Sequence, residues 1–446
     1  MPIKGVLLFI ALICSVPLCF VSPFYGIIAW QVIAFLNPQS SLFYWPPVAA
    51  FPWAEAIAIP TIIGLFLFSR RWLHRLSSRE CVLLLLLWTW FAITSVISTR
   101  SSAFAHHADM TWYRLGFVSK ILLMTFVIVA VVNNFERLRI MIIAIAGCFG
   151  YFVAKGVIFI GMTGGVFRIY GPPHSMIADN NDFGLALNMT LPIFFLLART
   201  EEKRWVRWLC GFLFVGAIPV VFFTYSRGAM VGLVVTSVLM ILQLRQRWIL
   251  IPIAALAMFL ALRYAPESWQ HRMDPTSQDV MDGSAHERLN AWAFSRNLAA
   301  DHPFTGGGFD TFTQQLFAEY APEGNDIHGP HSIYFQVLAE HGYIGLFLYA
   351  ALVIACFVSL YQTAKLAAGL EDQRMVQYAK MLRFSFVAFL ASGTFLGRAY
   401  FDYFFSMVAC VVILRLSVQE MVWEEADELD DAVQPIGEEQ MLPQGS

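Results

Sequence analysis

Residues 331–361 read HSIYFQVLAEHGYIGLFLYAALVIACFVSLY. From residue 342 onward the stretch is apolar and carries no charged side chain, and about 20 such residues form a helix long enough to cross a membrane. Directly before the apolar part stand two histidines, a glutamine and a glutamate. The stretch therefore predicts a membrane-crossing helix whose entrance presents side chains that can transfer protons.

The composition puts the whole chain in the same class. Of its 446 residues, 58% are hydrophobic and 13% are charged, and the mean hydropathy is +0.62, all far from the averages of soluble domains. Continuous apolar runs satisfy their backbone in a membrane as helices, so we expect an all-α integral membrane protein with about twelve crossings. These runs lie near 5–36, 49–69, 80–98, 116–132, 138–160, 184–198, 206–223, 228–243, 248–263, 342–361, 382–397 and 400–416.

The positions of lysine and arginine predict the orientation of these helices. Basic residues collect in four loops, which are therefore expected to be cytoplasmic: 70–79, 137–139, 199–207 and 245–247. Alternation then places five segments on the outer face: 99–115, 161–183, 224–227, 264–341 and 398–402. This parity is broken at the N-terminus, where Gly5–Phe20, Gly26–Leu36 and Val48–Phe68 make three runs; the first two of these are interrupted by Pro17 and by Ser22-Pro23. We expect them to be half-helices that together cross once or dip in and return.

Four parts of the chain follow from this pattern. Residues 1–263 are predicted to form about ten transmembrane helices, and residues 264–341 an outer helical domain that carries the catalytic residues. Residues 342–417 are predicted to form the C-terminal transmembrane helices. Residues 418–446 contain nine acids and no lysine or arginine, which predicts a disordered cytoplasmic tail.

The outer segment has signals of a small helical domain, and six of the chain's ten histidines lie in or beside it. Ser284 and Glu287 form a capping-box pair that predicts the start of a helix carrying Arg288 and Trp292. The three glycines 306–308 permit a tight turn, after which apolar residues at helical spacing predict a second, amphipathic helix, along the membrane surface or capping the bundle. The glycines lack the lysine and preceding strand of a phosphate-binding loop.

Several of these residues together resemble the O-antigen ligase superfamily. The resemblance is carried by motifs in a fixed order and on the outer face: Ser226-Arg227-Gly228, Arg288 with Trp292, Pro303 to Gly308, and His331-Ser-x-Tyr-x-Gln-x-Leu-x-Glu-x-Gly. Arg168-Ile-Tyr-Gly-Pro-Pro and Asp179-Asn180-Asn181 also resemble the O-glycosylation ligases of exosortase-containing bacteria. One departure is Ser332, because the family usually has asparagine after the histidine.

The resemblance implies a GT-C-like, metal-independent, inverting glycosyltransferase of lipopolysaccharide biosynthesis. Such an enzyme takes a glycan from an undecaprenyl diphosphate carrier and joins it to a hydroxyl, commonly of the lipid A core, at the periplasmic face of the bacterial inner membrane. Its expected partners are this donor, the lipid A core or a protein hydroxyl as acceptor, and membrane lipids. No cofactor, metal or nucleic-acid partner is expected.

Three residues are predicted to carry the reaction. His331 is the candidate general base, because its place before a helix disfavours the protonated ring; the alternative is that it only caps that helix. Arg227 and Arg288 are expected to hold the diphosphate, since guanidinium groups stay protonated and bind phosphate oxygens in pairs. The alternative for both is an arginine that extends to the membrane interface.

Five further residues are candidate substrate contacts, and each has a structural alternative. Arg168 and Arg398 lie at the outer rim, where interfacial placement is common. Asn181 follows Asp179 at a helix start, which favours capping, Tyr334 fits aromatic packing, and Asp402 fits a helix cap.

Other functions remain compatible with these motifs. An O-antigen polymerase or a protein O-oligosaccharyltransferase uses the same donor, and overall resemblance does not distinguish their acceptors. A lipid-linked glycan transporter would show broken or charged segments at the midplane and related halves, and the sequence has no convincing internal repeat. The sequence leaves the acceptor, the sugar and the oligomeric state open.

Overall fold

The computed structural model describes residues 3–41, 46–68, 73–273 and 278–433, and every regular element within them is helical. Eight helices are long and apolar enough to cross a membrane. They are α6 (Arg79–Arg100), α7 (Ala108–Val131), α8 (Phe135–Thr163), α9 (Asn180–Thr200), α10 (Arg204–Phe222), α12 (Arg247–Tyr264), α16 (Ile333–Gly369) and α18 (Asp402–Val433).

The remaining helices are shorter or more polar. Four are apolar: α1 (Ile3–Val21), α2 (Pro23–Gln31) with the π-helical turn η1 (Val32–Leu36), α5 (Trp53–Phe68) and α11 (Arg227–Leu242). The others are α3 (Pro38–Ser41), α4 (Pro46–Ala49), η2 (Leu73–Ser77), η3 (Ala105–His107), α13 (Glu267–Met273), α14 (Gln278–Asp301), α15 (Gln314–Tyr320) and α17 (Gln373–Gly393). The chain is thus an all-helical, multi-pass membrane protein, and the number of about twelve crossings stays a prediction.

Helices α1 and α2, which contain the apolar runs Gly5–Phe20 and Gly26–Leu36, form an antiparallel hairpin with its turn at Ser22. Phe20 at the end of α1 packs against Phe68 at the end of α5, so these two helices run in the same direction. Helix α2 runs the other way, since Pro23 and Gly26 lie beside the C-terminal half of α5. The expectation that the two runs together make one crossing is therefore wrong, and the alternative, in which the chain enters and returns, fits the fold. The cause is Ser22, whose extended backbone precedes a proline that starts α2.

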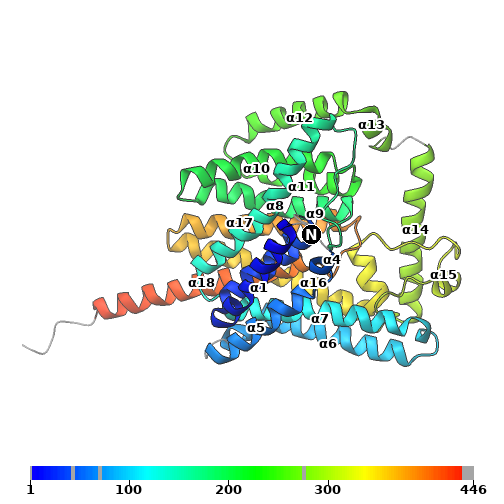
Figure 1. Cartoon of the computed structure of the whole chain (residues 1–446), viewed down its shortest axis with the longest axis horizontal. Helices are drawn as coiled ribbons and strands as arrows, with labels where there is room; N and C mark the ends of the chain where they lie inside the picture. The colour runs from blue at the N-terminus through cyan, green and yellow to red at the C-terminus, as the bar shows by residue number, and fades with distance from the viewer. Residues whose placement is uncertain (1–2, 42–45, 69–72, 274–277, 434–446) are drawn as a thin grey trace, which may run out of the picture.

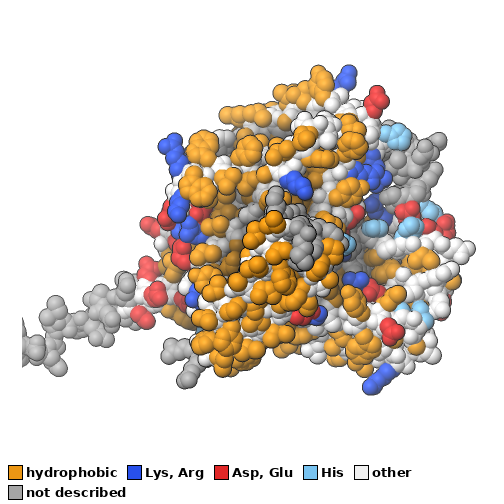
Figure 2. Space-filling view, viewed as in Figure 1, with side chains coloured by type: hydrophobic (Ala, Val, Ile, Leu, Met, Phe, Trp, Pro, Cys, Tyr) orange, Lys and Arg blue, Asp and Glu red, His pale blue; other side chains and the backbone are white. Residues whose placement is uncertain are grey.

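Ion pairs gather three of the four basic loops, together with the start of α17, at one end of the bundle, called here the basic end. Arg75 pairs with Glu420 of α18, Arg139 pairs with Glu201, and Arg374 approaches Glu136 and Glu202. Figure 2 shows charged side chains at the left end, a mostly apolar surface in the middle, and histidines together with further charged side chains at the right end. The shared placement agrees with the alternation predicted from the sequence, whereas Arg70 and Arg71 lie outside the described residues.

Helix α18 continues into the region predicted to be a disordered tail. It runs without interruption through Val433, and residues 434–446 lie outside the described residues. The prediction of disorder from 418 is therefore wrong for residues 418–433. The acids of this region alternate with good helix formers, and Glu420 is held by Arg75, so the helix extends past the apolar part.

The segment between α12 and α16 folds over the opposite end of the bundle, and we call its described residues, 265–273 and 278–332, the cap. Helix α14 runs across this end of the bundle (Figure 1). It packs through Phe294 and Leu298 against Phe317 and Tyr320 of α15 and against Phe104, forming a small apolar core. The cap is thus fixed to the bundle by buried side chains.

Two helices of the cap differ from their predicted bounds. Helix α14 begins at Gln278, upstream of Ser284, so the predicted capping box is wrong; residues 278–283 contain no proline that would prevent the helix from starting earlier. The second helix covers only Gln314–Tyr320, because Thr313 caps it with its hydroxyl and Asp310 has a left-handed backbone. Its apolar side faces α14 rather than a membrane surface.

Candidate functional site

A break in α16 and the triple glycine shape the entrance of the site. Gly342 interrupts α16 with φ +66° and ψ −168°. The N–H groups of Gly307 and Gly308 donate to the carbonyls of Ala339 and Glu340, each at 2.9 Å. The glycines therefore fasten the cap to the first part of α16, and they are not a phosphate cradle.

Replacing Gly306 with alanine is expected to destabilise the protein by about 2 kcal/mol or more, because strain at such a backbone position adds to a steric clash. Gly306 has φ +59°, and an added Cβ would lie 2.4 Å from the carbonyl oxygen of Ala339. The measurement is the melting temperature in detergent. Gly161→Ala is the matched control, because its Cβ meets nothing within 4 Å. An equal melting temperature for the two variants would contradict the role of Gly306.

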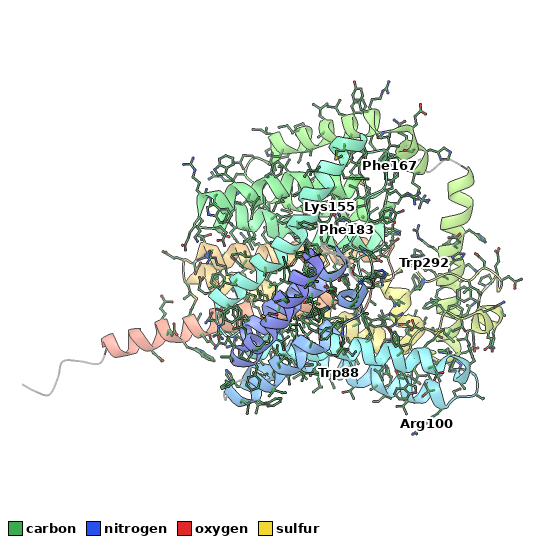
Figure 3. All side chains as sticks on the ribbon, in the orientation of Figure 1. Trp88, Arg100, Lys155, Phe167, Phe183 and Trp292 are labelled. Carbon is green, nitrogen blue, oxygen red and sulfur yellow. The ribbon has the colours of Figure 1, made fainter. Side chains whose placement is uncertain are left out.

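His331 precedes α16 in a strained conformation. Its φ of +42° lies in the left-handed region, which side chains other than glycine rarely occupy. Trp292 of α14 holds the chain beside it: the indole N–H donates to the carbonyl of Pro330 at 2.7 Å, and the ring stacks on Phe335. Trp292 is labelled on α14 in Figure 3. The cap therefore sets the position of His331.

The surroundings of His331 keep its imidazole neutral. The side chain is exposed to a cavity, and the protein around that cavity partly desolvates it, which lowers its pKa. The charge of Arg288 and the proximity of His328 lower the pKa further, whereas Asp179 and Glu287 oppose the shift. An imidazole of this kind is ready to accept a proton at neutral pH.

Four arginines form a cluster on one side of His331. They come from four separate elements: Arg168 from the loop after α8, Arg227 from the start of α11, Arg272 from α13 and Arg288 from α14. Burial lowers the pKa of Arg272, and the charges of Arg168 and Arg227 lower it further. Burial likewise lowers the pKa of Arg288, followed by the charge of Arg227. The four cations thus repel one another.

This cluster has unused hydrogen-bond donors. Among the described residues, no partner is present for three buried nitrogens: Nη2 of Arg227, Nε of Arg272 and Nε of Arg288. Buried, like-charged and unpaired donors are unfavourable unless an anion with several oxygens binds them. The arrangement therefore fits a phosphate or diphosphate.

Aromatic contacts hold Arg272 in this cluster. Trp269, one turn earlier in α13, stacks on Phe222 at 4.1 Å between ring centroids and donates to the carbonyl of Phe222. The hydroxyl of Tyr225 lies 3.1 Å from that of Ser268. These contacts fix α13 against the ends of α10 and α11.

A cavity of about 1140 Å³ opens at His331, and none of the four arginines of the cluster lines it. Its lining is rich in hydrogen-bonding side chains and includes more carboxylates than arginines. The charged and amide residues that line it are Asp109, Arg114, Asp179, Asn181, Asp182, Asp310, Gln314, Gln336, Glu340 and Arg398. Such a wall offers many acceptors to the hydroxyl groups of a sugar.

Ion pairs order the carboxylates of this cavity. Arg398 pairs with Asp182 at 2.5 Å, and Arg114 binds both oxygens of Asp310 at 3.1–3.2 Å. Glu340 accepts from the N–H of Asp310 at 3.1 Å and from the hydroxyl of Tyr400. The side chains are thus held in place before any ligand binds.

The structure brings together six of the eight predicted site residues. His331, Asn181 and Arg398 line the cavity, whereas Arg168, Arg227 and Arg288 belong to the arginine cluster.

Tyr334 and Asp402 are not among the residues that line the cavity. The Tyr334 hydroxyl donates to the carbonyl of Leu390, and the Asp402 carboxylate accepts the N–H of Tyr403 at the start of α18. These contacts favour the structural alternatives, packing and helix capping.

Sequence reasoning missed Arg272, Arg114 and Asp310. Their signal was available in part, because Arg114 and Arg272 both fall in segments predicted to be on the outer face. Neither arginine belongs to one of the motifs that carry the family resemblance. A search of every outer-face arginine would have included both.

Two family models match the chain. Residues 212–350 match a model described as O-antigen ligase, and residues 3–198 match one described as a family of unknown function. The first match contains Arg227, Arg272, Arg288 and His331, so it covers most of the arginine cluster and the histidine beside it. No curated protein matches the chain.

Proposed function

Because the chain belongs to the O-antigen ligase superfamily, we propose that it transfers a glycan from undecaprenyl diphosphate to a hydroxyl of the lipid A core. The observation that carries the proposal is the position of His331: its side chain lines the cavity, and it is close enough to Arg288 of the arginine cluster for that charge to lower its pKa. A base at this boundary suits a reaction between an anionic donor and a polyhydroxyl acceptor.

In the proposed reaction, His331 accepts the proton of the acceptor hydroxyl while that oxygen forms a bond to the anomeric carbon of the donor sugar. The bond from this carbon to the diphosphate breaks, and its electron pair leaves on the diphosphate oxygen. Arg227, Arg272 and Arg288 stabilise the charge that develops there, and Arg168 adds to the positive potential. Attack opposite the leaving group inverts the anomeric configuration.

The acceptor is proposed to enter the carboxylate-lined cavity. Asp182 and Asp310 present oxygens that accept from sugar hydroxyls, and Arg398 and Arg114 hold these two groups in place. Asn181 is a further candidate contact on the same wall.

The proposed setting is the bacterial inner membrane with the cap in the periplasm. The positive loops at the basic end support a cytoplasmic placement of that end. The outer domain is then the cap with the first part of α16, ending near the break at Gly342. The part of α18 beyond residue 417 extends on the cytoplasmic side.

The test is transfer by the reconstituted protein from undecaprenyl diphosphate-glycan to purified lipid A core, with EDTA present. The expected product is lipid A core that carries the glycan, because fixed arginines supply the charge needed at the diphosphate. Longer glycans on the carrier, with unmodified lipid A core, would instead identify a polymerase, and glycan on an added protein acceptor would identify a protein O-oligosaccharyltransferase. An unchanged donor would contradict glycosyl transfer and favour a transporter.

The acid limb of the pH profile is expected to depend on Arg288. Protonation of His331 stops the reaction, and partial desolvation together with the charge of Arg288 lowers its pKa, so activity persists below the ordinary histidine range. Arg288→Gln removes one of these causes and should move the limb to higher pH. The measurement is kcat/KM from about pH 5 to 8, the range in which histidine titrates. The same limb in both proteins would contradict the assignment of His331.

A further inference from the structure

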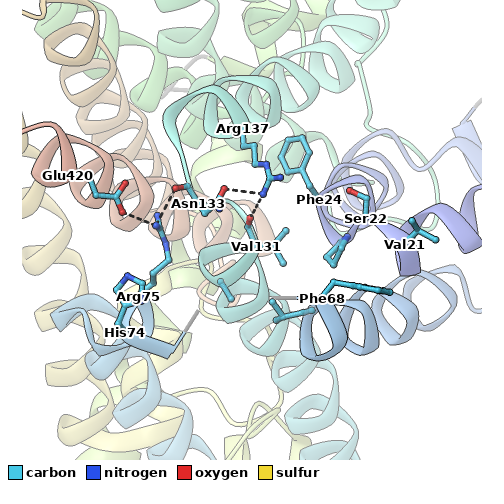
Figure 4. Close-up of a pocket in the computed structure, with 13 residues that line it drawn as sticks. Val21, Ser22, Phe24, Phe68, His74, Arg75, Val131, Asn133, Arg137 and Glu420 are labelled. Atoms are coloured by element: carbon cyan, nitrogen blue, oxygen red, sulfur yellow. Dashed lines mark hydrogen bonds and ion pairs between the residues drawn. The ribbon is translucent and has the colours of Figure 1, made fainter. Parts of the chain in front are cut away.

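A second cavity lies at the basic end, far along the bundle from the cap. Its volume is about 500 Å³, and it is enclosed by the turn between α1 and α2, the end of α5, η2 and the end of α7. Figure 4 shows Arg75 and Arg137 approaching Asn133 from two sides, with Glu420 beside Arg75. Neither the proposed reaction nor the family motifs involve these residues.

Arg75 is buried and only partly paired. It is 4% exposed, and its Nη1 donates to the carbonyl of Asn133 and to Glu420. Its Nε and Nη2 have no partner among the described residues. A buried guanidinium with two unused donors is costly unless an anion accepts from it.

Arg137 adds a second positive charge to this cavity. It donates to the carbonyl of Val131 and to the side chain of Asn133, and its guanidinium lies 5.3 Å from the centre of the Phe24 ring. Among the described residues that line the cavity, Glu420 is the one carboxylate, and it would repel an anion. Two arginines against one carboxylate leave a net positive site.

The cavity also has apolar walls that continue onto the lipid-facing surface. Leu65, Phe68 and Val21 line it, and the last two are 61% and 67% exposed on helices α5 and α1. A small inorganic anion would make no use of these side chains. A ligand with an anionic head and hydrocarbon chains would cover both parts.

We propose that this cavity binds the phosphate headgroup of an anionic phospholipid from the membrane leaflet at the basic end. The phosphate would accept from the free donors of Arg75 and from Arg137, and the acyl chains would lie along α1 and α5. Basic pockets between membrane helices commonly bind such headgroups. The lipid would thereby join the N-terminal hairpin to α7.

The experiment is native mass spectrometry of the full chain in detergent, titrated with phosphatidylglycerol or with phosphatidylcholine of the same acyl chains. One phosphatidylglycerol should bind in preference to phosphatidylcholine. Arg75→Gln and Arg137→Gln should each weaken that binding about fivefold, since one arginine near the membrane surface contributes about 1 kcal/mol. Arg245→Gln is the matched control, because Arg245 is exposed in the loop between α11 and α12 and does not line the cavity.

Three results would overturn the proposal. Equal binding of the two lipids by the wild type would remove the preference for an anionic headgroup. Unchanged binding in both cavity variants would place the lipid elsewhere. Inorganic phosphate that raises the melting temperature as much as phosphatidylglycerol would identify a site for the free anion. If Arg75→Gln does not accumulate, Arg137→Gln carries the test, because it leaves the pair of Arg75 and Glu420 intact.

Discussion

Replacing His331 with alanine is expected to lower kcat for glycan transfer by about 10²- to 10⁴-fold, the usual contribution of a general base. Binding of the donor should change little, because the diphosphate is proposed to be held by the arginine cluster. The measurement is steady-state transfer to lipid A core together with the dissociation constant of the donor. A variant that keeps more than about a tenth of the wild-type kcat would contradict proton transfer by His331.

Two controls separate the loss of the ring from effects on the backbone. His331 has φ +42°, a conformation that glycine adopts without strain, so His331→Gly removes the ring and keeps the backbone. It should be as inactive as His331→Ala; recovery of activity in the glycine variant would mean that strain caused the loss. His328→Ala is the second control: the His328 ring forms a hydrogen bond with Asp326, and this substitution is expected to change kcat little.

Replacing Arg288 with alanine is expected to lower kcat by about 10²- to 10³-fold, as for other groups that stabilise charge developing in a transition state. Arg288→Lys should restore only part of the rate, since an ammonium group cannot bind two phosphate oxygens in a fixed plane. Arg296→Ala is the matched control on the same helix, because Arg296 is exposed. An equal effect at both positions would contradict the proposed role of Arg288.

Arg288→Ala should also be more stable than the wild type when no glycan donor is present. Arg288 is buried beside Arg227 and Arg272, and its Nε has no partner in the described part of the chain. Removing it relieves repulsion and a desolvated charge, which is a common exchange of stability for function. The measurement is the melting temperature with and without the donor. The donor should stabilise the wild type more than the variant.

Much of the membrane architecture could be predicted because it depends on local properties of the chain. Hydropathy identified most of the crossing helices, and the distribution of lysine and arginine predicted which loops share an end, as the pair of Arg139 and Glu201 confirms. The gathering of His331, Arg227 and Arg288 also agrees with the motifs. These features can be predicted without knowing which helices contact one another.

The remaining features depend on contacts between distant residues. The bend at Gly342 is held by Gly307 and Gly308, and nothing in the local sequence distinguishes it from a continuous helix. Arg272 reaches the cluster through packing of Trp269 on Phe222, and its own neighbours in sequence give no hint of this. The fold of α2 back along α5 likewise depends on the close approach of Gly26 to Thr61.

The break in α16 also determines where a chimera that carries the cap of a relative could be joined to this protein. Backbone hydrogen bonds join Gly307 and Gly308 to carbonyls just before the break, and the N–H of Tyr343, just after it, donates to the carbonyl of Pro303. A chimera that ended its foreign segment at His331 would separate donors from acceptors that fit one another. A foreign segment that extends through Tyr343 would contain both the donors and the acceptors of these hydrogen bonds. The junction between the two sequences would then lie inside a regular helix.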